Sequence, residues 1–298
     1  MFQSSLTFIR THKKGPVFKS SIHETPIWAN SMTLSQKNAK WLASLSFVAN
    51  FFAQLYGMLA TPNMKDIHDA NLSFWSPQPI LVLIIFIPQL VLQLTWQFRL
   101  WKIDSQFDAD KFIEVEQMVD YVPYYALGNL CIAIWMIFWK QADLKTANLF
   151  VMVNSFTQLY YVFGRLPPME AQSISSILTY AVSTTLAGIG ILDLLHNGSV
   201  AYFDHQGPNL TVKILTLVFF IALVYFSDWL LGACLVYDLV ALAIGQWGIG
   251  QKSWGMLLGV YALGTAFIVI LQNFIRPSYF KKTTSGYTTV PNNESDLE

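Results

Sequence analysis

The sequence is divided into long apolar blocks, each close to the roughly 20 residues that a helix needs to cross a lipid bilayer. Eight such blocks are separated by short polar segments, and they cover residues 41–60, 79–101, 121–139, 147–165, 174–196, 210–226, 229–246 and 254–274. Apolar and polar residues do not alternate within them, as they would in the strands of a membrane barrel. Because backbone groups in hydrocarbon must be hydrogen-bonded within their own segment, the blocks predict helices. We therefore predict an all-α, polytopic transmembrane helical bundle of about eight spans.

The predicted bundle occupies residues 41–274, between a basic polar arm at 1–40 and a polar tail at 275–298. Only Ser227 and Asp228 separate the sixth block from the seventh. One helix through both blocks would be roughly 55 Å long, far longer than a bilayer core is thick. The division into two spans is therefore preferred, and seven spans with one re-entrant segment are the alternative.

Composition supports a lipid bilayer as the main partner of the chain. Charged residues make up 12% of the sequence, against about 25% in soluble domains. The formal net charge is zero, which argues against nucleic acid as a partner because that role needs a basic surface. Cys131 and Cys234 both lie in apolar blocks, so we expect buried free thiols and no disulfide.

The distribution of lysine and arginine predicts the orientation of the spans. Thirteen basic residues fall on the side of the N-terminus and five on the opposite side, so both termini are predicted to be cytosolic, or to face the matrix in a mitochondrion. The glycosylation triplets at Asn71, Asn197 and Asn209 fall on the predicted outer side. Residues 1–23 are basic and contain no acid, which resembles a mitochondrial presequence. An endomembrane or plasma membrane location is favoured, with a mitochondrial membrane as the alternative.

The acidic segment from residue 102 to residue 120 has apolar residues at helical spacing, namely Phe112, Val115 and Val119. A short interfacial helix that leads into the third span is one prediction for this segment. A solvated linker is the other.

Amide side chains recur near the middle of the first four blocks, where buried polar groups are costly. The candidate ligand-binding amides are Asn50, Gln89, Gln93, Asn129, Asn154 and Gln158. Gln89 and Gln93 are four residues apart and share one helix face. The amides either line a polar cavity at the midplane, or they form interhelical hydrogen bonds that hold the bundle together.

Asp238 is the remaining candidate site residue, because it lies in the middle of the seventh block. A carboxyl group at that depth must be protonated, paired or in contact with water. Proton coupling or ligand binding is the functional interpretation. A neutral acid that bonds to a neighbouring helix is the structural one.

Other small and ionisable residues suggest weaker hypotheses. Gly255 and Gly259 form a GxxxG pair, which predicts close helix packing within the chain or in a homodimer. None of the five histidines lies three or four residues from another, so no metal site is predicted and any cofactor is unknown. A convergence of Asp193, His196, Asp204 and His205 on the outer side would favour a membrane-embedded enzyme.

Several stretches resemble a fungal family of multi-pass membrane proteins of unassigned function. They are ATPNMKDIHDANLSFWSP (60–77), VDYVPYYALGNLCIAIWMIFW (119–139), QLYYVFGRLPP (158–168), AGIGILDLLHNGSVAY (187–202) and SDWLLGACLVYDLVALAIGQ (227–246). A fainter likeness to TspO-type tryptophan-rich sensory proteins rests on Asn129 to Trp135 and on Tyr160 to Arg165. That likeness implies a bundle that binds a hydrophobic molecule such as a porphyrin or a sterol. The chain departs from it in its eight spans and in its lack of a clear proline–tryptophan loop, so no binding residue is transferred.

Three classes of function follow from these observations. The leading one is a non-enzymatic bundle that binds or translocates a small or lipidic ligand in a polar-lined cavity. The second is a structural or assembly protein of the membrane, in which the amides only pack helices. The third is a membrane-embedded enzyme with its site on the outer face. Internal repeats, which many transporters contain, are not evident in the sequence.

Overall fold

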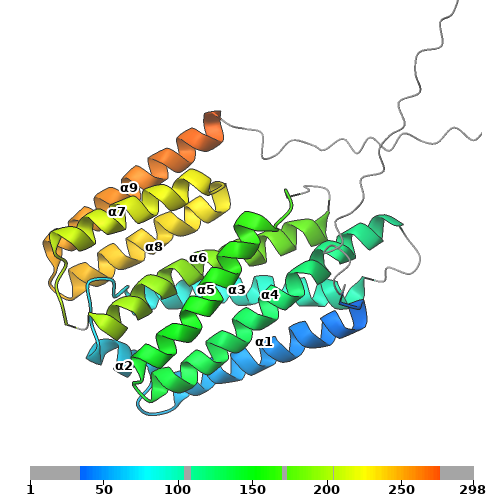
Figure 1. The fold of residues 1–298 in the computed structure, drawn as a ribbon, viewed down its shortest axis with the longest axis horizontal. Coiled ribbons are helices and arrows are strands. Elements are labelled where there is room, and N and C mark those ends of the chain that lie inside the picture. Colours follow the sequence, from blue (N-terminus) through cyan, green and yellow to red (C-terminus); the bar gives the residue numbers. More distant parts are fainter. Residues whose placement is uncertain (1–33, 104–108, 170–172, 204, 276–298) are drawn as a thin grey trace, which may run out of the picture. The chain divides into compact units, whose positions relative to one another are not determined.

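A computed structural model describes residues 34–103, 109–169, 173–203 and 205–275 of the chain. These residues form nine helices and no strand (Figure 1). The helices are α1 (Gln36–Leu59), α2 (Met64–Ala70), α3 (Pro79–Lys102), α4 (Ala109–Lys140), α5 (Leu144–Gly164), α6 (Ile174–Tyr202), α7 (Leu210–Phe226), α8 (Trp229–Gly248) and α9 (Lys252–Ile275). Most of the predicted arm and almost all of the predicted tail lie outside the described residues.

The all-α prediction is confirmed, and each of the eight apolar blocks coincides with one helix. Within the described ranges, six helices are long and apolar enough to cross a membrane, namely α1, α3, α4, α6, α8 and α9. α7 is a shorter apolar helix of 17 residues. The chain is therefore a multi-pass helical membrane protein.

The break between α7 and α8 lies at the two residues that the sequence indicates. The Ser227 hydroxyl donates to the Val224 carbonyl oxygen at 2.9 Å, at the end of α7. The Asp228 carboxylate accepts from the Leu231 amide at 2.8 Å and so caps the N-terminus of α8. Because backbone groups are satisfied on both sides of the break, two separate helices form here.

α4 begins at Ala109, within the acidic segment, so residues 109–120 are not a solvated linker but the first turns of the helix that continues into the third span. The Glu114 carboxylate forms an ion pair with the Arg99 guanidinium of α3 at 3.0 Å. It also accepts a hydrogen bond from the Ser175 hydroxyl of α6 at 2.7 Å. These contacts fix the first turns of α4 against two neighbouring helices, which the apolar pattern does not indicate.

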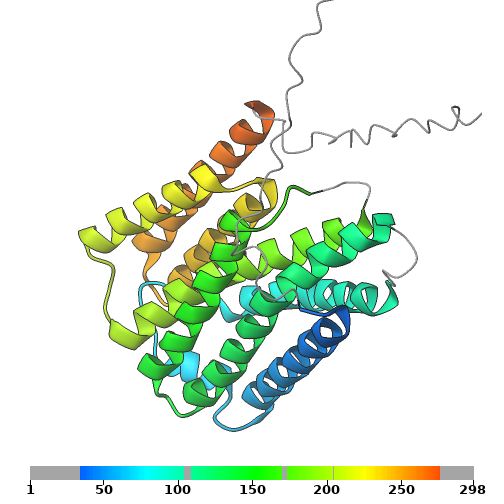
Figure 2. The ribbon, with the colours of Figure 1, turned by 45° about the vertical axis from the view of Figure 1, so that its right-hand side comes forward.

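α6 is the helix that the two sides of the bundle share. It contributes Val182 to a core cluster with α1, α3, α4 and α5, and Ile191 and Leu195 to another with α7, α8 and α9. Figures 1 and 2 both show α7, α8 and α9 side by side, with α6 next to them. α6 also extends to Tyr202, six residues beyond its predicted end at His196. Asp193 and His196 consequently lie about 13 Å and 9 Å along the helix from its last residue, at 1.5 Å per residue.

Candidate functional site

The amide side chains of the first helices bond to partners across helix interfaces. Asn50 of α1 donates to the Asn129 side chain of α4 at 2.8 Å. Asn129 in turn donates to the Tyr125 carbonyl oxygen one turn earlier at 3.0 Å. The Tyr125 hydroxyl donates to Gln93 of α3 at 2.7 Å. Side-chain hydrogen bonds of α4 thus reach both α1 and α3, which joins three helices.

The other predicted amides extend this arrangement toward α5 and α6. Gln158 of α5 accepts from the Tyr121 hydroxyl at 2.9 Å and donates to the Tyr124 carbonyl oxygen at 3.0 Å, both of α4. Gln89 of α3 accepts from the Thr185 hydroxyl of α6, while its buried amide nitrogen has no partner among the described residues. The candidate amides are therefore engaged mainly in interhelical bonds.

Gly128 of α4 makes room for the amides of α5. A Cβ atom added to Gly128 would lie 2.7 Å from the side-chain oxygen of Asn154. Asn154 and Gln158, one turn apart on α5, therefore approach the backbone of α4 more closely than any larger residue would permit. The sequence reasoning identified the buried amides, but it missed Gly128 and the tyrosine partners.

Asp238 occupies a different environment, at the contact between α6 and α8. Its side chain is 0% exposed, and neither carboxyl oxygen has a hydrogen-bond partner among the described residues. A Cβ atom on Gly188 of α6 would lie 2.5 Å from the Cβ of Cys234, so the two helices approach closely one turn before Asp238. Of the predicted site residues, Asp238 is thus the one with both side-chain oxygens enclosed and unbonded.

A second carboxyl group lies within electrostatic range of Asp238. α6 and α8 are joined by one returning helix and run in the same direction, so the turn after Gly188 lies level with the turn after Cys234. Asp193 belongs to that turn of α6, and its half-buried carboxyl group interacts electrostatically with that of Asp238. Salt bridges within the described residues involve neither carboxyl group. None of those salt bridges therefore places a lysine or arginine side chain against either acid.

Two histidines meet where α2 packs against α6. Nδ1 of His68, on α2, lies 3.0 Å from Nε2 of His196, on α6. Both side chains are buried. The ring of Trp139 of α4 lies 5.8 Å from that of His196. His196 is three residues from Asp193 on the same helix face. The sequence reasoning missed His68 as a partner because its segment looks like a polar loop.

The segment that carries His68, residues 60–78 between α1 and α3, covers one end of α6, α8 and α9. We call it the cap segment. Trp254 of α9 donates to the Phe74 carbonyl oxygen at 2.7 Å, and Gln246 of α8 donates to the Ser73 carbonyl oxygen at 2.9 Å. The Gln78 amide donates to the Ala241 carbonyl oxygen at 2.9 Å, less than one turn from Asp238. The cap segment is thus an integral part of the bundle interior.

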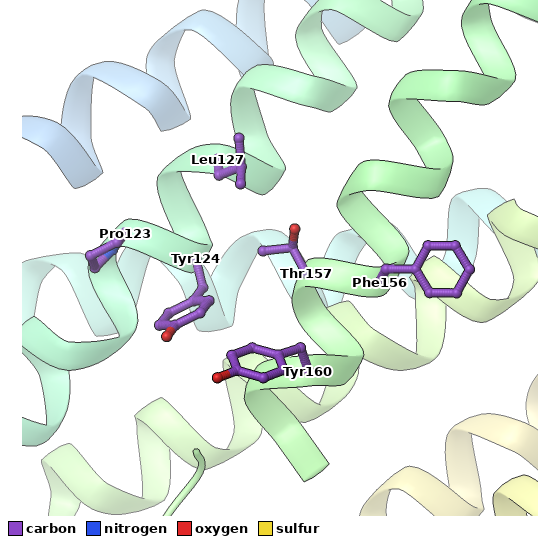
Figure 3. A pocket seen from close by; sticks show the side chains of 6 residues that line it. All are labelled: Pro123, Tyr124, Leu127, Phe156, Thr157 and Tyr160. Carbon is purple, nitrogen blue, oxygen red and sulfur yellow. The ribbon is translucent and has the colours of Figure 1, made fainter. Parts of the chain in front are cut away.

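Two surface hollows are formed away from these side chains. A groove of about 510 Å³ between α4 and α5 is lined by Pro123, Tyr124, Leu127, Phe156, Thr157 and Tyr160. Figure 3 shows the Tyr124 and Tyr160 rings next to each other there, with centroids 6.1 Å apart. A pocket of about 240 Å³ at the α7–α8 break includes Tyr180, Asp228 and Trp229. Neither hollow is lined by any of the seven predicted ligand-binding residues.

The glycine pair of α9 is split between two environments. A Cβ atom on Gly255 would lie 2.8 Å from the Ala243 carbonyl oxygen, so Gly255 serves the contact between α9 and α8. A Cβ atom on Gly259 would meet no heavy atom within 4 Å. Packing within the chain therefore uses Gly255, and a homodimer through this pair stays a prediction.

The outer-face metal hypothesis has no support in the described part of the chain. No group of three or more metal-binding side chains forms there, and Asp204 lies outside the described residues. The glycosylation triplet at Asn197 is also not placed as the sequence suggests. Asn197 is buried within α6 and accepts from the Trp135 indole at 2.7 Å, so it is not an accessible glycosylation site.

Comparisons of the chain with known protein families, with curated proteins and with solved structures find no match. The resemblances to a fungal membrane family and to TspO-type proteins stay predictions.

Proposed function

We propose that this membrane protein binds or translocates a small or lipidic ligand between α6 and α8, with Asp238 as its polar anchor. The single observation that carries the proposal is the enclosed Asp238 carboxyl group, which has no bonded partner among the described residues and is within electrostatic range of Asp193. An unpaired carboxyl group is costly in hydrocarbon, and ionisable side chains inside membrane helices mark substrate and ion pathways. Two acids within electrostatic range of each other favour a ligand that supplies hydrogen-bond donors or a positive charge.

The amide layer supports a second, structural role in the other half of the bundle. The bonds from Asn50 to Asn129 and from Tyr121 to Gln158 join α1, α4 and α5. Such bonds contribute about 0.6 kcal/mol each on average in membrane bundles. We therefore assign Asn50, Asn129, Asn154, Gln89, Gln93 and Gln158 to positioning helices, and we place the ligand at Asp238. A purely structural or assembly protein is the alternative function.

The proposed topology has eight spans, α1 and α3 to α9, with both termini on the cytosolic side. The excess of basic residues on that side supports this orientation. The cap segment then lies on the outer side. An endomembrane or the plasma membrane is the proposed location.

Mass spectrometry of small molecules that co-purify with the full-length protein tests the ligand proposal. The comparison uses wild type, Asp238→Asn and, as a control, Asp69→Asn, whose carboxylate forms an exposed ion pair with Lys65. Losing a charge-assisted hydrogen bond of about 1.5–3 kcal/mol should lower retention by roughly 10-fold or more in Asp238→Asn. The control should retain as much as wild type.

Two results would refute the ligand proposal. One is the absence of any retained small molecule in repeated purifications in several detergents and in nanodiscs. The other is equal retention by wild type and by Asp238→Asn. Equal retention by wild type and by a folded Asp238→Asn variant would favour the structural alternative.

A further inference from the structure

The His68–His196 contact has the geometry of a proton-transfer step. A neutral imidazole has one nitrogen that donates and one that accepts, so the 3.0 Å contact between Nδ1 of His68 and Nε2 of His196 shares one hydrogen. The other ring nitrogen of His196, Nδ1, is buried and has no hydrogen-bond partner among the described residues. His196 therefore has one nitrogen bonded toward the cap segment and one that is free inside the bundle.

Two acids continue the path from His196 into the bundle. Asp193 is three residues earlier on α6, where side chains on one helix face have Cβ atoms about 5–6 Å apart. Its carboxyl group interacts electrostatically with that of Asp238, whose two oxygens are enclosed and unbonded. Four titratable side chains from three helices thus follow one another from the cap segment to the middle of α8, and the first two of them are hydrogen-bonded.

Asp228 is the nearest carboxyl group to Asp238 along α8. Asp228 begins α8 about 15 Å from Asp238, at 1.5 Å per residue over ten residues. Leu231 and Leu235, which lie between them, are buried, and the Cys234 thiol interacts electrostatically with both carboxyl groups. The charged neighbours at the open end are Lys65 and Asp69, which interact with His68. Within the described residues, two titratable side chains of this series meet at hydrogen-bond distance only toward the cap segment, at His68 and His196.

We propose that His68, His196 and Asp193 relay protons between the cap side of the membrane and Asp238, so that the proton is the ion coupled to the ligand site. This proposal rests on the proposed function, whose coupling ion it identifies. A proton binds to Nε2 of His68, and the Nδ1 proton of His68 then moves to Nε2 of His196. His196 then releases its Nδ1 proton to Asp193, and Asp193 exchanges it with Asp238. Each step breaks one N–H or O–H bond and forms one. The second and third steps require the Asp193 side chain to move into contact with His196 and then with Asp238, because it is hydrogen-bonded to neither in this structure.

Infrared spectroscopy of the full-length protein in nanodiscs tests the relay without any ligand. The carbonyl band of the protonated Asp238 carboxyl group is identified by its loss in Asp238→Asn. The rate at which this band shifts after transfer to D₂O measures how fast the carboxyl proton exchanges with water. His196→Gln keeps a hydrogen-bonding side chain but removes the shuttle, and it should slow exchange by about 10-fold or more, since one transfer station is lost.

The control variant is Thr216→Val. It removes the hydrogen bond from the Trp75 indole of the cap segment to the Thr216 hydroxyl, 3.0 Å long, without removing a titratable group. Its exchange rate should equal that of wild type, because the relay is intact. If His196→Gln does not fold, His68→Gln serves instead, since His68 lies on the short helix α2 and not on a span.

Equal exchange rates in wild type and in a folded histidine variant would overturn the relay, as would the absence of a protonated Asp238 band. Slow exchange in Thr216→Val would also overturn it, because a loosened cap segment would then explain the effect. The ligand proposal is judged separately by retention of co-purifying molecules. If Asp238→Asn retains less of the co-purifying molecule while the histidine variant exchanges its carboxyl proton at the wild-type rate, the ligand proposal is supported and only the proton relay is refuted.

Discussion

Replacing Gly245 of α8 by alanine tests how firmly the cap segment is held in the bundle. A Cβ atom at this position would lie 2.5 Å from the Ser76 carbonyl oxygen and the Pro77 carbonyl carbon, and 2.6 Å from the Gln78 amide nitrogen. All three are backbone atoms, so no side-chain rotation relieves the clash. The cap segment must move away from α8.

The expected cost of this movement follows from the contacts it breaks. Overpacking costs about 1–3 kcal/mol. The hydrogen bonds from Gln78 to Ala241 and from Gln246 to Ser76 contribute about 0.5–1.5 kcal/mol each. Alanine is better than glycine in a helix by about 0.5–1 kcal/mol, which offsets part of the loss. The net loss is about 3 kcal/mol, which at about 2–4 °C per kcal/mol lowers Tm by roughly 6–12 °C.

A thiol-reactive fluorogenic dye measures this change, because Cys131 and Cys234 are buried free thiols that become accessible on unfolding. Gly259→Ala is the matched control on α9, where an added Cβ meets no atom within 4 Å. Its Tm should equal or slightly exceed that of wild type. A Tm for Gly245→Ala equal to that of the control would refute the close approach of the cap segment to α8.

Two further predictions concern hydrogen bonds in the two halves of the bundle. Gln158→Leu leaves the Tyr121 hydroxyl and the Tyr124 carbonyl oxygen without their partner, so it should lower stability by about 1–3 kcal/mol. A double-mutant cycle with Tyr121→Phe, measured by dye unfolding, should give a coupling of about 0.6 kcal/mol, and zero coupling would contradict the network. Burial lowers the pKa of His68 below its usual 6.5. As the pH falls, His68 is therefore protonated more readily when the cap segment is detached than when it is docked. Docking of the cap segment should therefore be strongest above pH 6.5 and weaken as the pH falls below it. Hydrogen-exchange mass spectrometry of residues 64–78, corrected for intrinsic exchange, checks this, and His68→Gln should abolish the pH dependence.

The sequence predicts the helices well where lipid alone decides their length. The block at 210–226 coincides residue for residue with α7, because hydropathy changes sharply at both of its ends. The sequence does not predict the ends of helices that are extended by a contact with a distant side chain. The polar residues after His196 look like a turn, yet Asn197 bonds to the Trp135 indole and continues α6. The start of α4 depends likewise on Glu114 meeting Arg99, a contact that no local pattern contains.

For the candidate site, the sequence reveals which groups are buried but not which of them are partnered. Asn50, Gln93 and Asp238 all lie within apolar blocks, and only the structure separates the bonded amides from the unbonded acid. His68 was missed because its segment is short and rich in polar residues. Phe74 and Trp75, two aromatic residues in an apparent loop, were the signal that this segment enters the interior.

The position of the cap segment also determines when the chain can complete its fold during synthesis. Its partners are far along the sequence: His68 and His196 are 128 positions apart, and Phe74 and Trp254 are 180 positions apart. A growing chain that has already inserted α1 and α3 must therefore carry an undocked cap segment until α8 and α9 have emerged. The final step of assembly is then the burial of an early segment by late helices, and a chain truncated before α8 would display that segment to the quality-control machinery of its membrane.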